Sequence, residues 1–440
     1  MITDHSSLTP FMQRVRKVHF IGIGGVGMSG IAEVMNTIGY QVSGSDISEG
    51  AVTEKLKAAG IKVFKGHAAD NVRDVDVVVT SSAIPADNPE VRVARARMIP
   101  VVPRAEMLAE LMRFSNGIAV AGTHGKTTTT SLVASVMAEG GLDPTYVIGG
   151  KLNSSASNAK LGSGQYLVAE ADESDASFLY LQPMLAVVTN VDADHLSTYG
   201  GDFGRLQDAF VEFLHHLPFY GLAIVCVDDE NARKLLPKIT RQVIRYGIEQ
   251  DADICASNIR TSGLQSTFDV MLPGSEDSMS ITLNLPGRHN VLNALAAIAV
   301  AYELGVGQEA IKTALRNFAG IGRRMQMYGD IKTPAGTITM VDDYGHHPTE
   351  VAATLQAVRS SWPDRRLVVV FQPHRYSRTH DLFEDFTSVL ADVDVLLISE
   401  VYAAGEQPVS GADARSLCAA IRQRGKVNPI FIEDIDGVES

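Results

Sequence analysis

The sequence predicts an α/β protein built from three consecutive α/β domains, and three observations support this prediction. Its 440 residues exceed what one domain of about 150 residues needs. Hydrophobic residues make up 45% and charged residues 20%, which is typical of a folded globular chain. Short apolar runs alternate with helical patterns, as in parallel sheets. We expect the domains to span residues 1–104, 105–321 and 322–440.

The first domain begins with a β-branched and aromatic strand pattern at residues 18–21, followed directly by a glycine-rich loop. A small-residue helical pattern covers residues 28–38, and a second helix is expected around residues 53–59. Strand patterns at residues 41–45 and 75–79 complete a βαβ alternation. The first domain is therefore predicted to be Rossmann-like.

The second and third domains show the same alternation of strand and helix patterns. In the second, a strand at residues 117–121 runs into a loop and a helix through Met137, and an Ala-rich helix at 293–304 ends before Gly305. Further buried-strand patterns lie at residues 166–169, 185–189, 222–227, 337–341, 367–371 and 395–398. The last three predict a Rossmann-like third domain.

The glycine-rich loop of the first domain fits G-x-G-x-x-G at Gly22, Gly24 and Gly27, between a strand and a helix. Glycines there allow backbone N–H groups to approach a diphosphate, and Asp46 could accept a hydrogen bond from a ribose hydroxyl. This motif alone does not separate a nicotinamide cofactor from a nucleotide-sugar. Glycines that serve only close packing of strand and helix remain an alternative.

A second loop, residues 122–127, ends in the Gly-Lys-Thr of a phosphate-binding loop, although the strict motif needs glycine where Val120 stands. Its backbone N–H groups can face triphosphate oxygens, and the Lys126 ammonium can reach the transferred phosphoryl group. The Thr127 hydroxyl can bind Mg²⁺. The second domain is therefore predicted to be P-loop ATPase-like.

Acidic side chains follow two predicted strands, at the edge where a doubly wound sheet opens its ligand crevice. They are Glu170, Asp172, Glu173 and Asp175 after one strand, and Asp192 and Asp194 with His195 after the next. Mg²⁺ prefers oxygen ligands, which makes His195 a less expected partner. We expect one or two residues of each cluster to hold the metal and the others to be solvated.

Two polar clusters follow strands in the third domain, at residues 342–348 and 372–378. Arg375 and Arg378 could present guanidinium groups to a carboxylate or phosphate, or could form structural salt bridges. His346 and His347 are adjacent and lack the spacing of a zinc site, so zinc is not expected.

Composition excludes several classes of partner. The net charge of −13 and the lack of a basic run argue against nucleic acid and anionic membrane surfaces. Three cysteines without metal-like spacing indicate a reducing compartment. No apolar run approaches the roughly 18 residues that a membrane span needs, so we expect a cytoplasmic protein without a membrane partner.

Taken together, these motifs resemble those of the Mur ligases of bacterial cell-wall synthesis. The resemblance runs from about Val18 to about Leu417. It is carried by residues 19–27, 122–128, 170–175, 194–196, 287–294, 342–348 and 371–379.

The resemblance implies an ATP-dependent amide ligase of the branch that joins L-alanine to UDP-N-acetylmuramate. ATP would phosphorylate the lactyl carboxylate of the sugar, and the alanine amine would attack the acyl phosphate, releasing ADP and phosphate. ATP and Mg²⁺ are the implied cofactors, UDP-N-acetylmuramate and L-alanine the small-molecule partners, and a monomer or homodimer the implied assembly. Phosphoryl transfer relies mainly on positioning and charge stabilisation, which suits these residues.

Three alternatives stay open. A related ligase could attach a recycled peptide to the same sugar, although residues 371–379 favour free alanine. A nicotinamide-dependent dehydrogenase would explain the first loop but leaves Lys126 and Thr127 without a role. A non-catalytic, ATP-gated interaction protein is the third.

The resemblance also assigns residues to roles. The UDP-sugar would contact Gly22, Gly24, Gly25, Gly27, Asp46, Ser81, Ser82 and Arg104. ATP would contact Gly122, Thr123, His124, Gly125, Lys126, Thr127, Thr128, His289, Asn290, Asn293, Arg324 and Asp343. The amino acid would contact Tyr344, His346, Arg375 and Arg378. Mg²⁺ would be held by Thr127, Glu170 and His195, and catalysis would depend on Lys126, His124, Glu170 and His195.

The sequence departs from the family pattern in two places. Several sister ligases use a carbamylated lysine for a second metal, but no lysine occurs between Lys160 and Lys234. This agrees with the alanine-adding branch and leaves the second metal without assigned ligands. Family members usually continue past the position of Ser440, so we expect the third domain to be incomplete.

Overall fold

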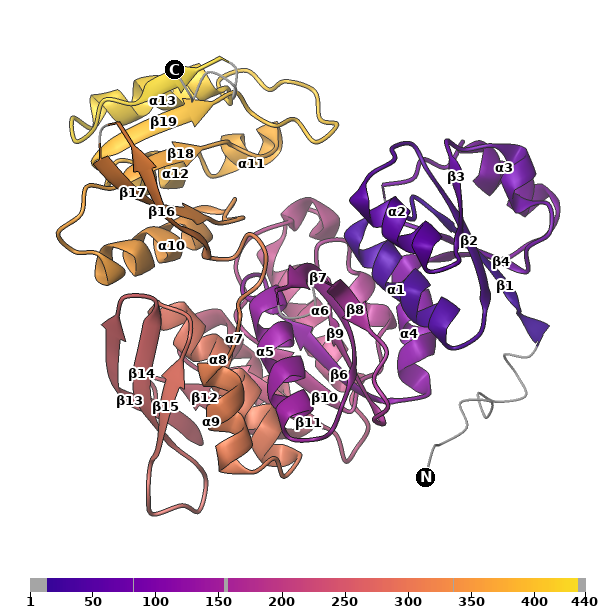
Figure 1. Cartoon of the computed structure of the whole chain (residues 1–440), viewed down its shortest axis with the longest axis horizontal. Helices are drawn as coiled ribbons and strands as arrows, with labels where there is room; N and C mark the ends of the chain where they lie inside the picture. The colour runs from indigo at the N-terminus through magenta and orange to yellow at the C-terminus, as the bar shows by residue number, and fades with distance from the viewer. Residues whose placement is uncertain (1–13, 82, 154–156, 335, 434–440) are drawn as a thin grey trace. The chain divides into compact units, whose positions relative to one another are not determined.

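The computed structural model describes residues 14–81, 83–153, 157–334 and 336–433, which form two compact units. The first unit holds residues up to 259 together with 267–284 and 290–322, and the second holds residues 260–266, 285–289 and those from 323 onward. The boundary expected near Arg104 falls inside the first unit, and the one expected near Ile321 falls at its end. Figure 1 shows the elements of both units.

The first unit begins with a five-stranded parallel sheet of order β3-β2-β1-β4-β5, which is the doubly wound Rossmann order without a sixth strand. Its strands are β1 (Lys17–Ile21), β2 (Gln41–Asp46), β3 (Lys62–Lys65), β4 (Val77–Thr80) and β5 (Val101–Pro103). Its helices are α1 (Val26–Thr37), α2 (Ala51–Ala58), η3 (Ala69–Val72), α3 (Pro89–Ala96) and α4 (Arg104–Arg113). The predicted Rossmann-like alternation is confirmed.

The register of this sheet explains where its glycine loop lies. Ile21 at the end of β1 pairs with Ser45 of β2, and the Gly22 N–H then donates to the Ser45 carbonyl at 2.7 Å. Gly22 has a φ of +76°, a backbone conformation that favours glycine. The loop therefore starts beside the carboxyl end of β2, which carries Asp46.

A ten-stranded sheet of order β15-β14-β13-β12-β11-β10-β6-β9-β7-β8 follows. Its strands are β6 (Asn116–Ala121), β7 (Thr145–Leu152), β8 (Ser157–Lys160), β9 (Tyr166–Glu170), β10 (Leu185–Val188), β11 (Leu222–Cys226), β12 (Gln242–Gly247), β13 (Ile254–Ser262), β14 (Gln265–Met271) and β15 (Met279–Leu283). Strands β6 and β9 to β12 pair in parallel, while β7 and β8 form an antiparallel pair.

Buried apolar strands and capped helices hold this part together. The helices are α5 (Lys126–Glu139), η4 (Ser177–Tyr180), η5 (Leu196–Tyr199), α6 (Phe203–His215), α7 (Glu230–Leu235), η6 (Leu236–Lys238), α8 (Arg288–Glu303) and α9 (Gln308–Arg316). Asp202 caps α6 by accepting hydrogen bonds from two backbone N–H groups of its first turn. Phe178 packs between Phe210 and Phe213, with ring centroids 5.2 and 5.1 Å apart. The core thus reaches from the sheet to α6.

The second unit contains an antiparallel pair, β16 (Gln326–Thr333) and β17 (Gly336–Asp342). A parallel sheet of β18 (Val368–Phe371), β19 (Val395–Ser399) and β20 (Ile430–Ile432) accompanies it. Its helices are α10 (Pro348–Ser361), α11 (Tyr376–Asp381), α12 (Phe383–Leu390) and α13 (Ala414–Gln423). Phe371, Phe386 and Leu417 belong to its core. In the part of the chain that the structure describes, none of the helices has the length and hydropathy to cross a membrane.

Candidate ligase site

A cavity of about 820 Å³ lies in the first unit, where the loops of both of its sheets meet. It is lined by Gly22, Gly24, Gly25, Gly27, Asp46, Ser81 and Arg104 from the first sheet, and by Lys126, Gly149, Glu170 and Asp172 from the second. Seven of the eight residues predicted to contact the UDP-sugar therefore share one wall. The eighth, Ser82, lies outside the described residues.

Asp46 holds the glycine loop in addition to lining the cavity. One of its oxygens accepts a hydrogen bond from the Gly24 N–H at 2.9 Å, and the other accepts from the Ser48 N–H at 3.0 Å. A Cβ atom at Gly24 would lie 2.8 Å from Asp46 Oδ2, so a larger side chain there would displace this carboxylate. The loop is therefore pre-formed around this carboxylate.

Arg104 connects the two halves of the cavity. Its guanidinium lies 3.3 Å from Asp172 Oδ2, and a Cβ atom at Gly27 would lie 3.0 Å from its Nη1. Burial alone would raise the pKa of Asp172, but the charges of Lys126 and Arg104 and a hydrogen bond from Ser174 lower it below its ordinary value. Asp172 is therefore ionised at neutral pH.

The phosphate-binding loop is held by the end of the neighbouring strand. The His124 N–H donates to Asn190 Oδ1 at 2.7 Å, and the Thr189 hydroxyl and the Asn190 amide donate to the His124 carbonyl at 2.7 and 2.9 Å. Gly125 has a φ of +81° and is the residue immediately before α5. Its backbone conformation lets the loop turn into the helix, whose first N–H groups can bind an anion.

Lys126 forms a buried ion pair with Glu173. Its Nζ lies 2.7 and 2.9 Å from the two carboxylate oxygens, and it also donates to the carbonyls of Gly122 and Thr123 at 2.6 and 3.1 Å. Burial raises the pKa of Glu173 to about 7 although Lys126 opposes this shift. Burial would lower the pKa of Lys126, but Glu173 and Asp172 outweigh it and raise that pKa. Lys126 therefore stays a cation.

Thr127 and Glu170 offer a set of oxygen ligands beside this pair. The Thr127 hydroxyl lies 3.3 Å from Glu170 Oε2, and the Gly149 N–H donates to Glu170 Oε1 at 2.6 Å. A hydroxyl and a fixed carboxylate are hard oxygen donors, which suits Mg²⁺. Because Glu170 lines the cavity next to Lys126, this donor set could place a metal at the phosphate end.

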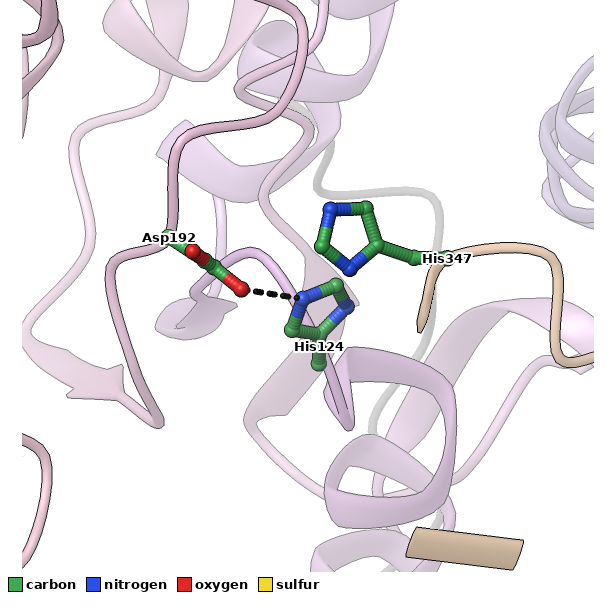
Figure 2. A group of neighbouring side chains, drawn as sticks. All are labelled: His124, Asp192 and His347. Atoms are coloured by element: carbon green, nitrogen blue, oxygen red, sulfur yellow. Dashed lines mark hydrogen bonds and ion pairs between the residues drawn. The ribbon is translucent and has the colours of Figure 1, made fainter. Parts of the chain in front are cut away.

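His124 and His195 stand on the segments that follow β6 and β10. Figure 2 shows His124 Nε2 pointing toward Asp192 Oδ2, at 3.2 Å. His195 has a φ of +55°, and its Nε2 lies 3.4 Å from Asp194 Oδ2. Each histidine thus has a carboxylate that can orient its ring.

Asn293 on α8 contacts α5 and lies against the phosphate-binding loop, and Asn290 is hydrogen-bonded to Asn293. The Thr129 hydroxyl donates to Asn293 Oδ1 at 3.1 Å, and the Asn293 amide donates to Asn290 Oδ1 at 3.2 Å. A Cβ atom at Gly125 would lie only 2.6 Å from Asn293 Oδ1. Of these two predicted ATP contacts, Asn293 therefore lies against the loop, and Asn290 adjoins it through Asn293. Thr128 is buried in α5, one residue beyond Thr127.

In the second unit, Tyr344 is the centre of a cationic and aromatic cluster. The guanidinium carbons of Arg323 and Arg324 lie 4.4 and 5.4 Å from its ring centroid, and the His346 ring centroid lies 5.0 Å away. Asp343 accepts hydrogen bonds from the backbone N–H groups of Met325 and Gly345, at 2.9 and 2.7 Å. The predicted Arg324, Asp343, Tyr344 and His346 are thus gathered in one place.

Arg375 and Arg378 follow β18 in the same unit, and His289 lies at the start of α8. Arg378 is 7% exposed, and Arg375 Nη1 lies 3.7 Å from Glu406 Oε1. Burial, together with the charges of Arg378 and Arg324, lowers the pKa of His346. Burial also lowers the pKa of His289 at the start of α8. Lowered pKa values favour the neutral forms of these histidines, so the positive charge beside His346 comes from the arginines, which suits an anionic group.

Three residues that shape these sites were not predicted from the sequence. Glu173 is one of four acidic residues after β9, and nothing in the sequence marks it as the partner of Lys126. Asn190 holds the phosphate-binding loop from the end of β10. His374 lies between His346 and Tyr402, with ring centroids 5.9 and 5.0 Å away, and burial lowers its pKa to about 4. The sequence signal for His374 was its place in the polar cluster that follows β18.

Sequence models of three protein families match successive parts of the chain. "Mur ligase family, catalytic domain" matches residues 17–116, "Mur ligase middle domain" matches residues 120–301, and "Mur ligase, glutamate ligase domain" matches residues 323–438. The chain belongs to the Mur ligase family. The predicted architecture of three α/β domains is thereby confirmed, and the protein is a family member of the ATP-dependent amide ligase type.

Solved structures of Mur ligases support this assignment. UDP-N-acetylmuramate-alanine ligase MurC from Thermotoga maritima is 31% identical, with a TM-score of 0.81 over 96% of this chain and 92% of that one. The murein peptide ligase mpl from Psychrobacter arcticus is 25% identical, with a TM-score of 0.71 over the same shares of the two chains. UDP-N-acetylmuramate:L-alanyl-gamma-D-glutamyl-meso-diaminopimelate ligase from Neisseria meningitides is 30% identical, with a TM-score of 0.63 over 70% of this chain and all of that one. Both kinds of Mur ligase are therefore similar to this chain.

Proposed function

We propose that this protein joins L-alanine to the lactyl carboxylate of UDP-N-acetylmuramate at the expense of ATP. The γ-phosphoryl group of ATP is transferred to the carboxylate, and the alanine amine then attacks the acyl phosphate. The amide bond forms as phosphate leaves, so each turnover yields ADP and one phosphate. An unactivated carboxylate is a poor electrophile, and this activation makes the amide bond accessible.

One observation carries the proposal: the glycine loop and the Lys126–Glu170 region line the same cavity. A sugar nucleotide bound along Gly22 to Gly27 would extend toward Lys126, where the phosphoryl group arrives. The volume of about 820 Å³ lies within the roughly 300–1,000 Å³ of small-molecule sites. The cavity can therefore bring the carboxylate to the phosphate-binding loop.

The residues around this cavity and those of the second unit would have different roles in the reaction. Lys126 and the N–H groups at the start of α5 would bind and orient the phosphates. Thr127 and Glu170, with His195 as a third ligand, would hold Mg²⁺, which supplies charge stabilisation to the transferred group. His124, oriented by Asp192, would face the acyl group. Tyr344, His346, Arg375 and Arg378 would bind the amino acid.

A ligase that attaches a recycled peptide to the same sugar is the second candidate, because two of the similar structures carry such names. The two functions are separated by a phosphate-release assay that offers either L-alanine or the tripeptide. Phosphate release that needs UDP-N-acetylmuramate and L-alanine supports the first function. Release only with the tripeptide supports the second, and equal release with no acceptor at all contradicts both.

A further inference from the structure

A buried carboxylate lies behind the wall of the nucleotide cavity. Glu90 on α3 is 0% exposed and receives hydrogen bonds from the Ser45 hydroxyl at 2.6 Å and the Asn71 amide at 2.6 Å. His67 Nδ1 lies 3.2 Å from Glu90 Oε2, and His19 Nε2 lies 3.6 Å from Glu90 Oε1. Side chains of β1, β2, η3 and the segment after β3 thus converge on one acidic group, and His67 is the member of this cluster that lines the cavity.

Glu90 is ionised in this setting. Burial would raise its pKa, but His19 and the hydrogen bonds from Ser45 and Asn71 more than offset burial and lower the pKa below its ordinary value. A buried carboxylate accepts hydrogen bonds and donates none. Each neighbour must therefore direct a proton toward it.

This requirement determines where the side-chain protons of Ser45 and His67 lie. The Ser45 hydroxyl donates its only proton to Glu90, so its oxygen can only accept from His67 Nδ1, which is 2.9 Å away. Nδ1 of His67 consequently carries the proton, which it shares between Ser45 and Glu90. In the neutral ring, Nε2 then bears a lone pair.

Nε2 is the atom of His67 that can meet a ligand. Within the described residues it makes no hydrogen bond, and the side chain is 16% exposed and lines the cavity. A ligand group opposite Nε2 must therefore donate a hydrogen bond. Such a donor could belong to the base or to the ribose of a nucleotide.

The topology favours the base. His67 follows β3, the outermost strand of the sheet, whereas Asp46 ends the adjacent strand β2. In sheets of this order the acidic residue after the second strand faces the ribose, which leaves the base farther out, toward the third strand. Uracil carries an N–H donor at N3, whereas the same position of cytosine is an acceptor.

We propose that Glu90 is a positioning residue that keeps His67 in its Nδ1–H tautomer, so that His67 Nε2 accepts a hydrogen bond from uracil N3–H and discriminates uridine from cytidine nucleotides. This inference rests on the proposed function, which places a uridine nucleotide in the cavity. Glu90 itself touches no ligand and acts only through the histidine.

Glu90→Gln reverses the hydrogen-bond polarity at almost unchanged shape. Asn71 Nδ2 and the Ala68 N–H both donate to Oε1, at 2.6 and 3.4 Å, so the amide oxygen takes that side. The amide nitrogen then faces Ser45 and His67 as a donor. His67 Nδ1 must now accept, its proton moves to Nε2, and Nε2 presents a donor to the ligand. The uracil N3–H donor then faces another donor, whereas the cytosine N3 acceptor faces a donor with which it can form a hydrogen bond.

The test is calorimetric binding of UDP and CDP to the full-length wild-type protein and to the variants. Glu90→Gln is expected to weaken UDP about tenfold and to strengthen CDP, so that the ratio of the two affinities falls by about a hundredfold. His67→Ala is expected to weaken UDP about tenfold without any gain for CDP. Asp87→Asn, which removes an exposed charge near α3, is the matched control and should leave the ratio unchanged.

An unchanged ratio in Glu90→Gln would overturn the proposal, and so would a wild-type His67 that ¹⁵N NMR finds protonated at Nε2 alone. The NMR measurement needs no variant, so it decides the matter even where Glu90→Gln does not fold. A merely structural role would lower both affinities together and could not strengthen CDP. Phosphate release tests the ligase function separately: a working ligase with an unchanged ratio contradicts only the role of Glu90.

Discussion

Both carboxylate oxygens of Glu173 lie within 2.9 Å of the Lys126 ammonium. With the carbonyls of Gly122 and Thr123 also in contact, the three N–H donors of Lys126 are all directed at the protein. A triphosphate that enters the loop must replace some of these contacts. The ion pair therefore keeps the lysine charged and in place before nucleotide binds.

Lys126→Met should destabilise the protein by about 3 kcal/mol near pH 8, because removing one partner of a buried ion pair leaves the other charge uncompensated. The folded-state pKa of Glu173, already raised to about 7 from 4.5, would rise further without the lysine. A carboxyl group with a raised folded-state pKa costs stability as the pH rises from its unfolded pKa through its folded pKa. The deficit should therefore shrink near pH 5, which urea unfolding at both pH values measures.

The double variant Lys126→Met/Glu173→Gln is the control for this prediction. It removes the uncompensated carboxylate and should recover most of the lost stability at about pH 8. A deficit of equal size at both pH values, or no recovery in the double variant, would contradict the ion-pair account.

Thr127→Val should weaken Mg²⁺-dependent nucleotide binding by about tenfold or more, because it removes one proposed oxygen ligand beside Glu170. Titration of ADP with and without Mg²⁺ measures the effect. Thr130→Val is the matched control, since its hydroxyl donates to the Lys126 carbonyl within α5, at 2.8 Å. Equal losses in both variants would show that the Thr127 hydroxyl has no special role.

Gly122→Ala should destabilise the phosphate-binding loop for a steric reason. Its φ is +134°, and a Cβ atom would lie 2.0 Å from Thr189 Oγ1. Gly141 has a φ of +76° with no neighbour within 4 Å of such an atom, so Gly141→Ala isolates the conformational cost of about 1 kcal/mol. Thermal unfolding should show Gly122→Ala at least about 2 kcal/mol less stable than Gly141→Ala. Similar stabilities would argue that the loop relaxes freely.

Asp394→Asn should lower the Tm at neutral pH, because Asp394 accepts hydrogen bonds from Arg359 and from the Leu367 N–H. These bonds lower its pKa from 3.8 to about 2. A depressed carboxyl pKa adds stability that is complete above pH 3.8 and is lost as the pH falls through about 2. The Tm difference between wild type and variant should therefore close over that range. A difference that persists below it would assign the effect to packing.

Local sequence patterns predicted most of the elements that build the cavity. Apolar runs such as residues 185–189 correspond to β10, and the two glycine loops were identified because each stands between a strand and a helix. Such signals depend on neighbouring residues alone. The helix expected from Asn293 begins at Arg288, since its polar first turn lacks an apolar face that a periodicity could reveal.

Contacts between distant segments could not be predicted in the same way. The β7–β8 pair and the strands β13 to β16 are short or half-exposed, so their patterns resemble loops. Glu173 became the partner of Lys126 through the pairing of β6 with β9, which the sequence does not specify. Glu90 and His67 are 23 positions apart, and they meet because the sheet places β4, which precedes α3, in one sheet with β3, which precedes His67.

The most direct test of the proposed function is mass spectrometry of the product formed from ATP, UDP-N-acetylmuramate and L-alanine. The account predicts UDP-N-acetylmuramoyl-L-alanine in amounts equal to the phosphate released, and none in the Lys126→Met variant. UDP-N-acetylmuramate that stays unmodified with L-alanine but is converted with the tripeptide would contradict the assignment of alanine as the substrate.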